Sequence, residues 1–166
     1  MKQLKLCTII GIIFVIAIGS LAHFMYEWTD HSFVIGLFAP VNESVREHMK
    51  LVFFPMLVYS IFMNSKFRKS YPGITASLCL GIITGTLLVP LFFYGYTAVI
   101  GHDAFALDIA DFVLSIVIGF TVAYKLAPSR LLKRYTLPLC CLVCIFLICL
   151  VIFTYSVPAH NPLSDG

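Results

Sequence analysis

Five long runs of apolar residues dominate this chain. They lie at about residues 4–23, 45–63, 73–100, 109–126 and 137–157. Each run has about 18 to 28 residues, and a helix of that length can cross a hydrocarbon core about 30 Å thick. With 60% hydrophobic and 11% charged residues, the chain lies outside the usual range of soluble domains. The sequence therefore predicts an all-α, polytopic membrane helix bundle with five transmembrane helices, and one integral membrane domain over residues 1–166.

The charged residues are divided between the two ends of these runs. Nine of the eleven Lys and Arg residues fall on one side, and all eight carboxylates and all five histidines fall on the other. Short cytoplasmic loops carry an excess of Lys and Arg, so the N-terminus is predicted inside and the C-terminus outside. Basic residues gathered at helix ends favour the lipid bilayer as partner and give no indication of nucleic-acid binding.

An alternative makes the first run a cleaved signal peptide. Lys2 and Lys5 form a basic start, and Ser20-Leu21-Ala22 resembles a small-residue cleavage site. The apolar run is longer than a usual signal core, which favours a retained helix.

Three polar groups are predicted at similar depth near the outer face. Helical spacing places His23 with Glu27 on one face of the first run, and Asp108, Asp111 and Ser115 on one face of the fourth. The second run begins with the densest polar stretch, which contains Asn42, Glu43, Glu47, His48 and Lys50, and His160 lies near the carboxyl end. An ionisable group inside a hydrocarbon core is costly, so Asp111 is a functional candidate.

These residue types are suited to binding a divalent metal such as zinc. Neutral imidazoles and carboxylates are zinc ligands, and a zinc ion with an open position promotes hydrolysis. We assign His23, Glu27, His48 and His160 to the metal, and Glu43, Glu47 and Asp111 to catalysis. Asn42, Lys50, Asp108 and Ser115 complete the predicted pocket. The spacing differs from the H-E-x-x-H motif of zinc proteases, so the hypothesis of a membrane-embedded hydrolase acting on a lipid or envelope substrate rests on residue type.

Two other functions remain open. Asp111 and the histidines could relay protons in a proton- or cation-linked small-solute transport component, for which a chain this short suggests a homo-oligomer. The protein could instead be a structural or accessory membrane subunit whose polar groups satisfy one another. Helix capping is an alternative explanation for some of these residues. Ser44 followed by Glu47 matches a capping box, and Asp108 is suited to the first turn of a helix.

Small residues in the third run predict a close contact between helices. Ser77, Gly81 and Gly85 recur at intervals of four, which places them on one face of a helix. Such a face lets a neighbouring helix approach closely, so we interpret it as a packing seam rather than a functional site.

The segments H-F-M-Y-E-W at 23–28 and G-L-F-A-P-V-N-E-S at 36–44, followed by Glu47-His48 and Lys50-Leu51, carry a family resemblance. With the tail P-A-H-N-P-L at 158–163, they resemble a family of small bacterial membrane proteins known only as a domain of unknown function. The resemblance implies a five-helix, multi-pass protein of the bacterial cytoplasmic (inner) membrane and no established activity.

Overall fold

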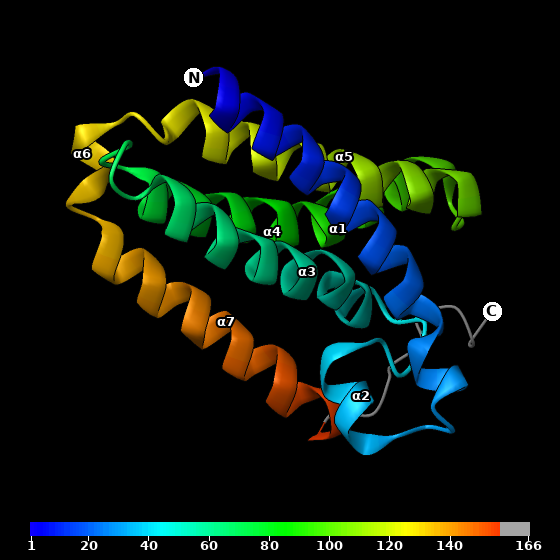
Figure 1. The fold of residues 1–166 in the computed structure, drawn as a ribbon. Helices are drawn as coiled ribbons and strands as arrows, with labels where there is room; N and C mark the ends of the chain where they lie inside the picture. Colours follow the sequence, from blue (N-terminus) through cyan, green and yellow to red (C-terminus); the bar gives the residue numbers. More distant parts are fainter. Residues whose placement is uncertain (157–166) are drawn as a thin grey trace.

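The computed structural model describes residues 1–156, and within them seven helices follow one another (Figure 1). They are α1 (Lys2–Trp28), α2 (Phe33–Phe38), α3 (Val45–Phe67), α4 (Ile74–Ile100), α5 (Phe105–Leu126), α6 (Arg130–Lys133) and α7 (Thr136–Ser156). The long helices α1, α3, α4, α5 and α7 lie alongside one another, and the short helices α2 and α6 lie at opposite ends of the bundle (Figure 1). The predicted all-α fold is confirmed for this part of the chain, and each of the five apolar runs forms a long helix.

The prediction of five transmembrane helices is wrong for the run at 45–63. Among the described residues, four helices are long and apolar enough to cross a membrane, namely α1, α4, α5 and α7. The remaining long helix, α3, has 23 residues, but its ends carry Arg46, Lys50 and Lys66 and leave a shorter apolar stretch. Twelve of its residues are buried, since α3 packs against α1 and α4 and also contacts α5 and α7. A helix covered by other helices on much of its surface can carry polar groups that a lipid-facing helix cannot.

The seam predicted from the small residues of the third run is confirmed. The most extensive helix contact in the bundle joins α4 to α5. A Cβ atom built on Gly81 would lie 2.6 Å from the carbonyl oxygen of Gly119, and one on Gly85 would lie 3.1 Å from that of Ser115. The missing side chains therefore let the two backbones touch, and this contact fixes the position of α5 along α4.

The outer surface of the bundle is apolar. Ile13, Ile61, Leu91 and Val99 are each more than 60% exposed. Exposed apolar side chains over the length of several helices would be unfavourable in water and are normal against lipid tails. The surface therefore supports a lipid bilayer as the surroundings of this multi-pass protein.

The ends of the bundle differ in charge. The amino end of α1, the connection from α3 to α4, and α6 gather at one end (Figure 1). That end carries nine Lys and Arg residues, whereas every described Asp and Glu belongs to the other half of the molecule. The division predicted from the sequence is therefore also a division in space.

Candidate functional site

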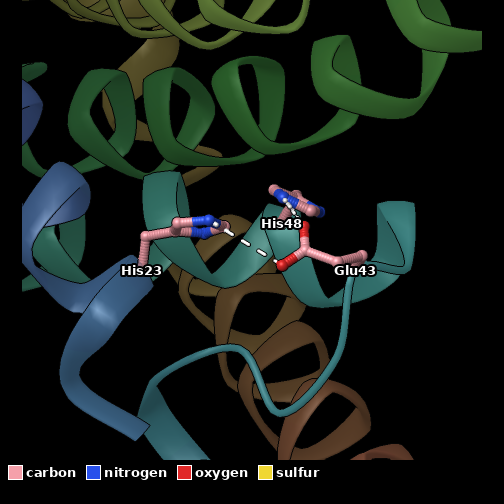
Figure 2. Close-up of side chains that lie close together, drawn as sticks. All are labelled: His23, Glu43 and His48. Atoms are coloured by element: carbon pink, nitrogen blue, oxygen red, sulfur yellow. Dashed lines mark ion pairs between the residues drawn. The ribbon is translucent and has the colours of Figure 1, made fainter. Parts of the chain in front are cut away.

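Two imidazoles and one carboxylate converge at the acidic end of the bundle (Figure 2). His23 comes from α1, His48 from the first turn of α3, and Glu43 from the connection that leads into α3. His48 Nε2 lies 3.4 Å from Glu43 Oε2, and His23 Nε2 lies 3.8 Å from Glu43 Oε1. Each residue offers one ligand atom, and these three atoms lie within 4.8 Å of one another. We call these three residues the His–Glu cluster.

Local hydrogen bonds position the two members of the cluster that belong to the start of α3. Ser44 is the N-cap, and its hydroxyl accepts a hydrogen bond of 3.4 Å from the backbone N–H of Glu47. The Asn42 side-chain oxygen accepts a 3.0 Å hydrogen bond from the Ser44 backbone N–H. These bonds turn the chain at Glu43 so that its carboxylate faces the histidines. The N-cap predicted at Ser44 is confirmed, but the reciprocal half of the predicted capping box does not form, because the Ser44 backbone N–H donates to Asn42 and the Glu47 carboxylate accepts from Val41 and Lys50.

The geometry at His48 fits a metal ligand. His48 Nδ1 lies 3.0 Å from the carbonyl oxygen of Ser44, and a carbonyl can only accept, so Nδ1 carries the proton. In the neutral ring Nε2 then presents a lone pair to the Glu43 carboxylate, and two acceptors that face each other require a proton or a cation between them. Ligands about 2.0–2.1 Å from a tetrahedral zinc ion lie about 3.3 Å apart. The separation of His48 Nε2 from Glu43 Oε2, 3.4 Å, is close to this value, whereas that of His23 Nε2 from Glu43 Oε1, 3.8 Å, is longer.

His23 is less completely held. Its ring packs edge-on against Phe24 and lies 5.5 Å, centroid to centroid, from the ring of His48. Its Nδ1 is buried and has no hydrogen-bond partner among the described residues. Metal-binding histidines usually donate from their second nitrogen, and residues 1–156 supply this outer contact to His48 but not to His23.

The cluster is accessible at its edge. The side chains of His23 and His48 are 32% and 31% exposed, and that of Glu43 is 78% exposed. If an ion were held here, three protein ligands at an open edge would leave a coordination position for water or substrate, as in catalytic zinc sites, whereas structural sites are closed by four.

Glu47 and Lys50, predicted in the same pocket, instead form a buried ion pair. Both side chains are 0% exposed, and Lys50 Nζ lies 2.6 Å from Glu47 Oε2. The ammonium group also donates to the carbonyl oxygen of Gly36, and Glu47 accepts from the backbone N–H of Val41 at 3.2 Å. The pair thus ties the segment around α2 to α3. The general-base role assigned to Glu47 stays a prediction.

The α5 residues form a second polar group beside the cluster. Asp111 is 6% exposed and accepts a 3.0 Å hydrogen bond from the Ser115 hydroxyl. Asp111 lies within the range of charge interactions with Asp108 and His48. Asp108 lies in the first turn of α5, as predicted, and accepts a hydrogen bond from the Tyr96 hydroxyl of α4.

The remaining predicted site residues are not brought into the cluster. The Glu27 side chain is exposed and makes no hydrogen bond or ion pair with the residues that the structure describes. Asn42 serves the turn before α3, and His160 lies outside the described residues. Sequence reasoning missed Tyr96, whose hydroxyl donates to Asp108 12 residues away, and Gly36, whose carbonyl oxygen accepts from Lys50 14 residues away.

Comparisons with known proteins place the whole chain in one family. The model of a family of unknown function, DUF6512, matches residues 1–165. No curated protein and no solved structure matches the chain. Over its whole length, the chain therefore belongs to the DUF6512 family, a family of unknown function.

Proposed function

We propose that this membrane protein binds a divalent metal ion, such as zinc, through the His–Glu cluster and uses it to hydrolyse a lipid or envelope substrate. The observation that carries the proposal is the convergence of two imidazole nitrogens and one carboxylate oxygen within 4.8 Å, from the end of α1 and from the start of α3. Two histidines and one glutamate form a known ligand set of catalytic zinc sites.

Ion binding and proton transfer would be carried out by different residues of the chain. His23, Glu43 and His48 would hold the ion, and the chemistry that the ion would supply is the activation of water. With Glu43 used as a ligand and Glu47 engaged by Lys50, Asp111 is the predicted catalytic carboxylate that remains to accept a proton. Its burial and the hydrogen bond from the Ser115 hydroxyl would hold it in place.

The charge distribution supports a location of the site at the outer face of the membrane. The basic end of the bundle is expected in the cytoplasm, because Lys and Arg accumulate on that side. The N-terminus would then be inside, and the His–Glu cluster would face the outer leaflet of a bacterial cytoplasmic membrane, where lipid and envelope substrates are available.

The first prediction concerns bound metal. Wild-type protein purified in detergent without chelator is expected to contain about one zinc or other divalent ion per chain by mass spectrometry. His48→Ala and His23→Ala should each weaken binding by at least about 100-fold, since loss of even an outer partner of a ligand costs 10–100-fold.

His102→Ala is the matched control, because His102 is exposed in the connection between α4 and α5 and lies outside the cluster. It should leave the metal content unchanged. Thermal melting should show that all three variants fold. A metal-free wild type, or equal metal loss in the control, would exclude the proposed centre.

A second candidate function is proton- or cation-linked transport of a small solute. It is favoured by one observation, the burial of Asp111 within an apolar helix beside a single hydroxyl partner. In this case Asp111→Asn, which preserves shape and the contact to Ser115, should abolish pH-dependent flux into liposomes without changing the melting temperature. Unchanged flux in Asp111→Asn would remove this candidate. If wild type shows neither flux nor metal, an accessory subunit is the better explanation.

A further inference from the structure

The basic end of the bundle contains a recess that the site chemistry does not use. Arg68, Lys69 and Pro72 from the α3–α4 connection line one side, and Arg130 and Lys133 of α6 line the other. The recess has a volume of about 480 Å³. We call these five residues and the space between them the basic recess.

The two walls of the basic recess are fixed against each other. The backbone N–H of Gly73 donates a 3.1 Å hydrogen bond to the carbonyl oxygen of Ala127. A Cβ atom on Gly73 would collide with the carbonyl oxygen of Ser129, so only glycine permits this approach. The Ser129 hydroxyl in turn accepts from the backbone N–H of Leu132 and starts α6. Contacts that do not involve the four cationic side chains therefore hold together the two segments that carry them.

The charges of the basic recess are not balanced by protein. No described carboxylate forms an ion pair with Arg68, Lys69, Arg130 or Lys133, because the ion pairs in residues 1–156 all lie at the opposite end. The neighbouring cations behave differently, since Lys66 lies over the rings of Phe62 and Phe67, and Arg134 over that of Tyr135. Four like charges that surround one space repel one another and favour an anion between them.

We propose that the basic recess binds the phosphate-bearing head group of an anionic phospholipid. Arginine guanidinium groups form paired hydrogen bonds to phosphate, and lysines add charge. The volume falls within the roughly 300–1,000 Å³ typical of sites for small organic groups, so it exceeds the need of a single phosphate ion. Leu131, between the two cations of α6, and Leu137, at the start of α7, are 77% and 74% exposed, so this end of the bundle also offers apolar side chains to acyl chains. Basic pockets between helices at the cytoplasmic side are suited to such head groups.

The test compares three probes on the full chain in neutral detergent. Native mass spectrometry should show cardiolipin bound at least about tenfold more tightly than phosphatidylcholine, because only the first has a net negative head group. Cardiolipin should raise the melting temperature, and millimolar inorganic phosphate should raise it much less. Equal binding of the two lipids overturns the proposal. Equal stabilisation by inorganic phosphate assigns the recess to a soluble phosphate and also overturns it.

A pair of double variants locates the binding. Arg68→Gln/Arg130→Gln removes one cation from each wall and should weaken cardiolipin binding about tenfold or more. Lys125→Gln/Arg134→Gln removes two charges from the same end, outside the basic recess, and should change binding little. Equal weakening by both pairs would indicate diffuse attraction and contradict a built site. If the first pair fails to fold, the comparison of the three probes on wild type still decides the question.

Discussion

Lys50→Met is expected to lower the free energy of unfolding by about 3 kcal/mol, near the lower end of the cost of breaking a buried ion pair, because it removes the closest cation from the buried Glu47 carboxylate and leaves only Arg46, whose Nε lies 3.9 Å from Glu47 Oε1. Both side chains are fully buried, and the ammonium group donates to Glu47 and to the carbonyl oxygen of Gly36. Methionine fills a similar volume but donates no hydrogen bond. The measurement is unfolding of the purified protein in mixed micelles by titration with a denaturing detergent.

Two further variants separate loss of the ion pair from loss of a lysine. Lys125→Met removes an exposed lysine of α5 and should change stability by no more than about 0.5 kcal/mol. Glu47→Gln/Lys50→Met should cost less than the sum of the two single variants, by about 0.5–3 kcal/mol, because the removed groups interact directly. Hydrogen exchange at Gly36 and Val41 should become faster in Lys50→Met. A loss below about 1 kcal/mol would contradict the tether between α2 and α3.

The sequence predicted the helices well because hydrocarbon imposes a length and an apolar composition that can be counted along the chain. The prediction failed at α3, because a count of apolar residues along the chain does not show which helix will be surrounded by the others. Arg46 and Lys50 interrupt the apolar run near its start, and only the packing of α1 and α4 around α3 explains why a partly polar helix lies inside the bundle. Helix order around a bundle is not contained in hydrophobic periodicity.

The site was predictable to the extent that it depends on helical rise. His23 and His48 were expected at the same depth because each lies 18 residues from a basic residue at the opposite end of its own helix, and the structure places their rings together. Glu27 shares the helical face of His23 in sequence, yet Glu43 supplies the carboxylate. A loop residue follows the path of its connection, which here depends on the cap at Ser44 and not on periodicity.

Gly81→Val is the other substitution with a large expected effect, a loss of about 3 kcal/mol or more in the free energy of unfolding. Its Cβ would lie 2.6 Å from the carbonyl oxygen of Gly119 and 3.0 Å from the Cβ of Ala123. These neighbours are backbone and a methyl group, which cannot rotate away, so α4 and α5 would have to separate. Overpacking of a rigid contact costs about 1–3 kcal/mol, and separation of the largest helix interface should reach the upper part of that range or exceed it.

Gly95→Ala is the matched control within the same helix, because a Cβ on Gly95 would have no atom within 4 Å. Here alanine should raise the free energy of unfolding by about 0.5–1 kcal/mol, since it restricts the unfolded backbone without a clash. Changes of opposite sign in the free energy of unfolding at these two glycines of one helix would show that the seam depends on the close approach of the helices and not on glycine itself. A loss at both positions would attribute the effect to helix composition, and no loss at Gly81 would mean that α4 and α5 do not meet at this seam.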